Sequence, residues 1–146
     1  MSARLLYVMD PMCSWCWGFA PVLESLAEQA AAAGVPLQLV VGGLRRERIA
    51  VDAVARVRYL GYWQAVNAST GQLFDFERGL PEGLVYDTEP ACRALVTARQ
   101  LDPESTWPLA KLIQQAFYTE GVDVTQAPQL LRLAEQAGIP RIEFAE

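Results

Sequence analysis

The sequence predicts an α/β fold in which a β-α-β unit is followed by a long helical region. Two observations predict the unit. Residues 5–9 are a short apolar run and residues 37–41 indicate a second strand closed by Gly42-Gly43, and the segment between them has apolar side chains at helical spacing. A third observation is the change of pattern after Gly43, where helical periodicity replaces strand-like runs. We therefore divide the chain into residues 1–43, the β-α-β part, and residues 44–146, an all-helical part.

The β-α-β unit is bounded by turn signals. Its first strand ends at Asp10-Pro11, and its second ends at Gly42-Gly43. The helix between them is expected to stop near Gly34, and it is indicated by Phe19, Val22, Leu23, Leu26 and Ala30. Because a crossover of this kind is almost always right-handed, the two strands are expected to be parallel.

Helices dominate the expectation for residues 44–146, at about 52–68, 88–100, 105–121 and 125–137. Residues 71–87 contain several glycines and a proline and are expected to form a long loop. The arginines at positions 45, 46 and 48 are interpreted as a solvated start to this region. Pro140 is expected to open a further helix rather than a proline loop and strand.

Composition and charge exclude several functions. The 146 residues are 52% hydrophobic and 20% charged, which is typical of one globular domain. The net charge is −5 without a basic block, so neither nucleic acid nor an anionic membrane surface is an expected partner. No apolar run approaches the roughly 20 residues of a membrane span. We see no secretory leader after Met1, so a reducing cytoplasm is the expected location.

Three cysteines and the absence of histidine limit the chemistry further. Without histidine, a Ser-His or Cys-His pair and a histidine-ligated metal are excluded. Three thiolates also cannot complete a Cys₄ zinc site within one chain. We therefore expect no metal and no bound cofactor.

The stretch MDPMCSWCWG carries the chemistry that remains. Cys13 is expected at the first turn of a helix, where unpaired N–H groups and the helix dipole favour a thiolate. Cys16 follows one turn later, within reach of Cys13. The spacing predicts a nucleophile and a resolving thiol, and the alternative is a pair of buried, inert cysteines. Asp10 is expected either to tune the thiols or to cap the turn before Pro11.

The residues from Asp10 to Pro21 resemble the active-site stretch of the DsbA-like branch of the thioredoxin superfamily, in the group of short disulfide isomerases. The stretch DTEPACRA at residues 87–94 is similar to that group as well. The resemblance implies Cys13 as nucleophile, Cys16 as resolving thiol, and Ser14 and Trp15 as the pair that tunes the redox potential. It also implies that Pro21 kinks the active-site helix.

The resemblance further implies a thioredoxin-like fold with a large helical insertion after the second strand, which agrees with the change at Gly43. Such proteins complete their sheet after the insertion and place a cis-proline opposite the cysteines. Nothing after Gly138 resembles that part, so the C-terminal part of the sheet is expected to be absent from this chain.

We therefore expect a thiol–disulfide oxidoreductase or disulfide isomerase. Its substrates would be protein or small-molecule disulfides and dithiols, with glutathione among the candidates. Two alternatives remain: a glutathione-dependent transferase or isomerase resembling the kappa-class and chromene-carboxylate enzymes, and a non-catalytic interaction module.

Five other side chains carry weaker expectations. Trp15 is expected on the surface, whereas Trp17 and Cys92 are expected to pack in the interior. The aromatic residues of the 71–87 loop, Phe74 and Phe76, either line a substrate groove or pack against the helices.

Overall fold

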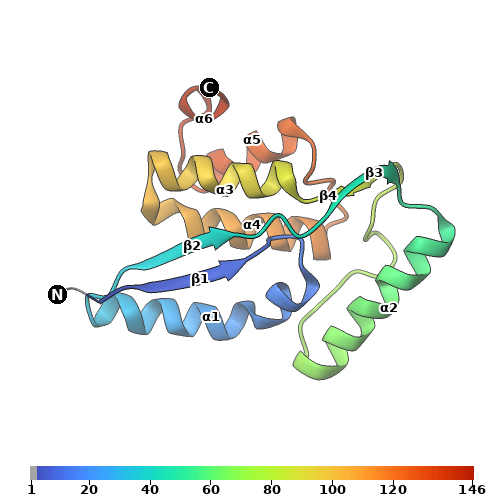
Figure 1. Ribbon diagram of the computed structural model, residues 1–146, viewed down its shortest axis with the longest axis horizontal. Helices are drawn as coiled ribbons and strands as arrows, with labels where there is room; N and C mark the ends of the chain where they lie inside the picture. Colours follow the sequence, from blue (N-terminus) through green and yellow to red (C-terminus); the bar gives the residue numbers. More distant parts are fainter. Residues whose placement is uncertain (1–2) are drawn as a thin grey trace.

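The computed structural model describes residues 3–146, and the predicted β-α-β unit is present (Figure 1). Strand β1 (Leu5–Met9) pairs with β2 (Leu37–Val41), and helix α1 (Ser14–Ala32) connects them. The strands are parallel, with Leu5 opposite Leu37 and Met9 opposite Val41. The expected parallel pairing is therefore confirmed.

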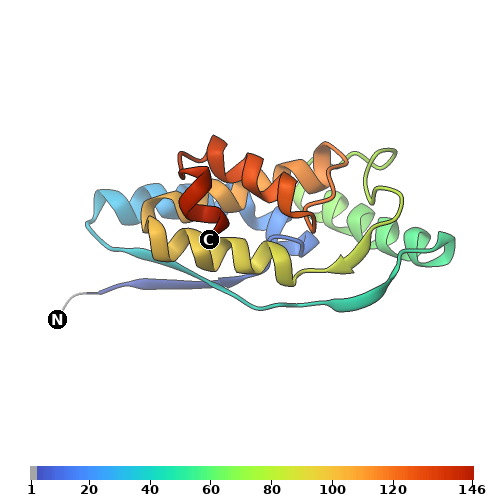
Figure 2. The ribbon, with the colours of Figure 1, turned by 90° about the horizontal axis from the view of Figure 1, so that it is seen from above.

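One face of this strand pair is covered by helices, while the other faces outward. Figure 2 shows β1 and β2 as a layer along one side of the molecule, with the helices on the other side. Leu6 and Val8 of β1 are exposed, as are Phe19 and Val22 of α1. Only Leu23 and Ala30 are buried among the apolar residues that indicated this helix.

Residues 44–146 are not purely helical, which corrects the all-helical expectation for this region. They contain β3 (Arg46–Ala50) and β4 (Val85–Asp87), which pair antiparallel. Arg46 and Arg48 are solvated, as expected, but they lie in a strand at the start of this region, and the expected loop at 71–87 ends in a strand. All five residues of β3 are exposed, so its sequence lacks the alternation that marks a half-buried strand.

The expected helices are all present. They are α2 (Ala53–Thr70), α3 (Glu89–Leu101), α4 (Thr106–Thr119), α5 (Ala127–Gln136) and the short α6 (Arg141–Ala145), with a 3₁₀ turn at Pro103–Ser105. Pro140 precedes α6 and so opens a helix, as expected. Within the described residues, none of these helices is long and apolar enough to cross a lipid bilayer.

An aromatic cluster forms the centre of the core. Trp63 of α2 meets Phe117 and Tyr118 of α4 at ring-centroid distances of 5.9 and 4.9 Å. The ring centroid of Phe74 lies 5.4 Å from that of Trp63, and the ring centroid of Phe76 lies 5.8 Å from that of Phe74. Both loop phenylalanines therefore pack against the helices, which decides between the two expectations for them.

Candidate active site

The two cysteines lie at the junction of β1 and α1. Cys13 occupies the N-cap position of α1, and its N–H donates to the carbonyl oxygen of Asp10 at 3.1 Å. Cys16 lies one turn into the helix, and both thiols are free and half-buried. The junction places Cys13 where backbone N–H groups are left without helical partners, as the sequence predicts.

The two thiols have different proton affinities. A hydrogen bond from the Cys16 thiol lowers the pKa of Cys13 to about 6, and partial burial opposes this shift. Backbone N–H groups of Cys16 and Trp15 lower the pKa of Cys13 further. The same thiol–thiol hydrogen bond raises the pKa of Cys16 well above its usual range, and burial adds to it. Cys13 is therefore the thiolate at neutral pH, and Cys16 keeps its proton.

Tyr7 of β1 lies against the second thiol. Burial is the main cause that raises the pKa of Tyr7, and the neighbouring Cys16 raises it further. A protonated phenol can donate to a sulfur, and the hydrogen bond from Tyr7 acts to lower the pKa of Cys16. Tyr7 is therefore the side chain placed to favour a thiolate on Cys16.

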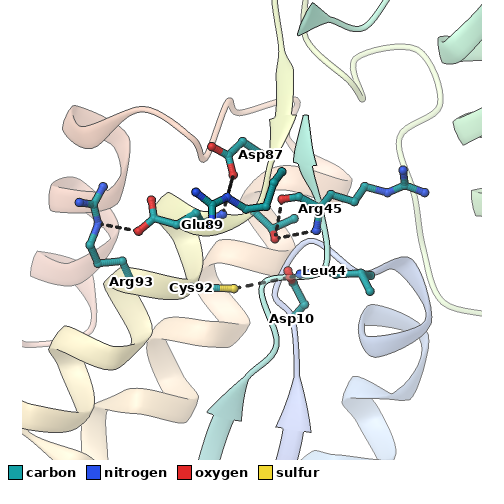
Figure 3. A network of polar contacts seen from close by, with 9 residues as sticks. Asp10, Leu44, Arg45, Asp87, Glu89, Cys92 and Arg93 are labelled. Atoms are coloured by element: carbon teal, nitrogen blue, oxygen red, sulfur yellow. Dashed lines mark hydrogen bonds and ion pairs between the residues drawn. The ribbon is translucent and has the colours of Figure 1, made fainter. Parts of the chain in front are cut away.

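Asp10 braces the loop that carries Cys13. One of its carboxylate oxygens accepts the N–H of Met12 and the other accepts the N–H of Leu44, each at 2.8 Å. The thiol of Cys92 donates to the second oxygen at 3.5 Å. Figure 3 shows Asp10 between Leu44 and Cys92, where it joins the β1–α1 loop to the start of the β3 region and to α3. The turn role expected for Asp10 is thus present.

Asp10 also has an electrostatic effect, because its negative charge acts to raise the pKa of Cys13. Replacement of Asp10 by asparagine is expected to lower the pKa of Cys13 and to destabilise the fold by roughly 1–3 kcal/mol. The loss arises because Met12 and Leu44 donate to different oxygens of Asp10, whereas an amide has only one acceptor oxygen. Urea unfolding and the pH profile of Cys13 alkylation measure the two effects. An unchanged stability would contradict the bracing role.

Cys92 is buried, as expected. Burial and the charge of Asp10 raise the pKa of Cys92 to about 12, so this thiol stays protonated. A protonated, enclosed thiol is a poor nucleophile. The structure therefore agrees with a packing role for Cys92.

A side chain from the loop after α2 replaces the hydrogen bond that the proline inside α1 removes. Pro21 has no N–H to donate to the carbonyl of Trp17 four residues earlier. The amide of Gln72 donates to that carbonyl at 3.0 Å instead. The indole N–H of Trp17 donates in turn to the carbonyl of Leu73 at 2.8 Å, and its ring stacks on Tyr118. Trp17 is therefore a packing residue, and the loop after α2 is tied to the active-site helix.

A groove of about 440 Å³ opens beside Cys13. Ser14 and Trp15 line it together with Cys13, and the Trp15 side chain is exposed, as expected. Much of the remaining lining comes from distant parts of the chain and includes Leu44, Arg45, Tyr59, Tyr62 and Tyr86. A second groove, of about 630 Å³, borders Cys16 and has an apolar lining that includes Val8, Phe19 and Val22.

Three residues around the thiols were not predicted from the sequence: Tyr7, Arg45 and Tyr86. The hydroxyl of Tyr86 donates to the carbonyl of Met12 at 2.5 Å, although the two residues are 74 positions apart. No local pattern signals such a contact. Within residues 3–146, no group of three or more acidic or cysteine side chains is placed to hold a metal ion.

Comparison with known proteins identifies the fold. No family model matches the sequence, and a search of curated proteins found no match. Among solved structures, a "putative protein disulfide isomerase" from Nitrosomonas europaea is 41% identical, with a TM-score of 0.85 over 99% of this chain and 69% of that one.

A second match is the cytosolic disulfide reductase DsbM from Pseudomonas aeruginosa, at 26% identity and a TM-score of 0.82. It is matched over 97% of this chain and 69% of its own. A structure of DsbM with GSH has the same TM-score at 29% identity, over 97% of this chain and 70% of that one. The chain therefore belongs to the DsbA-like family of the thioredoxin superfamily.

Proposed function

We propose that this protein is a thiol–disulfide oxidoreductase in which Cys13 is the nucleophile and Cys16 the resolving thiol. The observation that carries the proposal is the difference in proton affinity between the two neighbouring thiols. In this proposal residues 1–43 supply the dithiol, and residues 44–146 supply the facing wall of the groove. Similarity to a disulfide isomerase and to a disulfide reductase supports the class of reaction.

The proposed reaction is two successive thiol–disulfide exchanges. The Cys13 thiolate attacks one sulfur of a substrate disulfide, forms a mixed disulfide and releases the other half as a thiolate, which takes up a proton. Cys16 then loses its proton and attacks the Cys13 sulfur, which releases the second half of the substrate as a thiol. The substrate gains two electrons, and the protein is left with a Cys13–Cys16 disulfide. No bound cofactor is needed, because the dithiol itself carries the electrons.

Substrates of this proposal are protein or small-molecule disulfides. Glutathione is a candidate because DsbM, a similar protein, has been solved with GSH. A cytosolic location is also part of the proposal, supported by the description of DsbM as cytosolic.

The pKa of Cys13 predicts the pH dependence of its reactivity. With a pKa of about 6, the rate of alkylation by iodoacetamide should be half-maximal near pH 6 and should fall below that pH. About 90% of Cys13 would be thiolate at pH 7, compared with about 3% of a free cysteine. Replacement of Cys16 by alanine removes the main cause of the shift, so the midpoint should move upward. A wild-type midpoint near 8.5 would contradict the assignment.

A Cys16→Ser variant tests the order of the two steps. Since the second attack cannot occur, treatment with oxidised glutathione should leave one glutathione on Cys13, visible as a single adduct by mass spectrometry. The wild-type protein should instead release both glutathiones and retain an internal disulfide. An adduct on Cys92, or none at all, would refute the proposal.

A further inference from the structure

We propose that Arg45 binds a carboxylate of the substrate, so that the groove beside Cys13 selects small disulfides carrying a negative charge near the reacting sulfur. This inference rests on the proposed function and deepens it by assigning a specificity-determining residue. The evidence is the placement of a single, rigidly held cation in the groove that contains the nucleophile.

The side chain of Arg45 is held by aromatic rings. Its guanidinium carbon lies 4.9 Å from the centre of the Tyr59 ring and 5.4 Å from that of the Tyr86 ring. Its Nη1 also donates to the Tyr59 hydroxyl at 3.3 Å. A guanidinium held on aromatic faces keeps its charge and loses little further rotamer freedom when it binds an anion.

The backbone of Arg45 is fixed to the same frame as Cys13. Its N–H donates to the hydroxyl of Thr88 at 3.2 Å, and the Thr88 N–H donates back to its carbonyl at 2.9 Å. The preceding residue, Leu44, donates to Asp10, which also holds the loop of Cys13. Figure 3 shows the Arg45 side chain extending away from the acidic side chains of Asp87 and Glu89. The backbone that carries the cation and the loop that carries the nucleophile are therefore joined through Asp10 and Thr88.

Apart from the Cys13 thiolate, the groove carries one charge. Among the described residues that line it, Arg45 is the only basic side chain, and no carboxylate lines it. The acidic neighbour of Arg45, Glu47, has an oxygen 3.7 Å from Nη1; the Glu47 side chain is 52% exposed, whereas that of Arg45 is 33% exposed. A pair with one exposed, flexible partner contributes little, so a substrate carboxylate can displace Glu47. A guanidinium offers a carboxylate two parallel hydrogen bonds, which the tyrosine and tryptophan walls cannot do.

The size of the groove favours a small molecule. A volume of about 440 Å³ lies within the range of pockets that hold ligands of low molecular weight. The expected substrate therefore combines a disulfide, a carboxylate within a few bonds of it, and an apolar portion that lies on the aromatic wall. Oxidised glutathione meets the first two requirements and is the natural probe.

The test compares oxidation of the reduced protein by oxidised glutathione and by bis(2-hydroxyethyl) disulfide, which is neutral. Replacement of Arg45 by methionine should slow the reaction with oxidised glutathione by about 10- to 100-fold. It should change the reaction with the neutral disulfide by less than about twofold. Arg45→Lys should retain part of the preference, and Glu47→Gln should increase the rate with oxidised glutathione. Arg48→Met is the matched control, because Arg48 is an exposed arginine outside the groove.

A binding measurement separates this inference from the proposed function. S-methylglutathione carries the carboxylates but cannot undergo exchange, and its binding can be followed through the indole N–H signal of Trp15. Arg45-dependent binding without any exchange would overturn the proposed function alone. Exchange that is equally fast in wild-type and Arg45→Met proteins, or equally slowed with both disulfides, would overturn the role of Arg45. An unchanged pH profile of Cys13 alkylation in Arg45→Met checks that the nucleophile is intact.

Discussion

Replacing Cys13 with serine is expected to slow thiol–disulfide exchange by at least about 10³-fold. A serine hydroxyl is not ionised near neutral pH and cannot form a disulfide. The variant loses the hydrogen bond to the Cys13 thiolate, but burial still raises the pKa of the remaining thiol, Cys16, so it is a poor substitute. The consumption of oxidised glutathione by the reduced protein measures the loss.

The matched control for this variant is Cys92→Ser. This side chain is buried, and a serine hydroxyl can replace the thiol as the donor to Asp10. Exchange should therefore stay within about twofold of the wild-type rate, since Cys92 stays protonated and enclosed. If Cys13→Ser kept a substantial part of the activity while Cys92→Ser lost it, the identity of the nucleophile would be wrong.

Replacing Trp63 with alanine is expected to destabilise the fold by about 3–5 kcal/mol. Trp63 is almost completely buried and meets the rings of Phe74, Phe117 and Tyr118. A Cβ placed on Gly79 would lie 2.4 Å from the Trp63 ring, so the loop backbone approaches the ring closely and glycine is required there. Alanine would leave a cavity that these neighbours cannot fill without moving.

Chemical denaturation measures this effect, with Val57→Ala as the matched control on the same helix. Val57 is 73% exposed, so its truncation should change the free energy of unfolding by less than about 0.5 kcal/mol. The difference is large relative to the 5–15 kcal/mol that stabilises a typical domain. A loss below 1 kcal/mol for Trp63→Ala would contradict a core centred on this residue.

Local patterns made much of the fold predictable. Strand β1 is a continuous apolar run, and β2 is apolar except for Gln38. Thr88, Ser105 and Pro140 directly precede helices. Thr88 occupies the N-cap position of α3, as the sequence predicts, but its hydroxyl makes no capping hydrogen bond to that helix. The hydroxyl instead bonds to the backbone of Arg45, so the residue that starts the helix also makes a long-range contact.

The strands β3 and β4 were not predictable in this way. Strand β3 exposes every residue, and β4 has only three, so neither has a buried face that could produce a period of two. Their pairing joins Arg46 to Asp87, 41 positions later in the chain. Helix α2 and the loop after it lie between the two strands in the sequence, so no short stretch of sequence contains both. Polarity in β3 therefore favoured a solvated segment over a strand.

The candidate site divides in a similar way. Cys13 and Cys16 are adjacent on one helix turn, so their spacing alone predicted the pair. The groove lining is different, because Arg45 and Tyr86 join Cys13 there from distant positions in the chain, which no short sequence pattern encodes. Asp10 was predictable in part. Its place in the turn before Pro11 follows from the sequence, but its hydrogen bond to Leu44, 34 residues away, does not.

A redox titration of the wild-type protein tests the central claim most directly. The protein is equilibrated in glutathione buffers of increasing oxidation, the free thiols are alkylated, and each cysteine is quantified by mass spectrometry. We predict that Cys13 and Cys16 become protected together in one two-electron transition, at a potential between roughly −270 and −120 mV, while Cys92 stays free. If Cys13 and Cys16 remained alkylatable at every ratio, or became protected independently of each other, they would not be a redox-active dithiol.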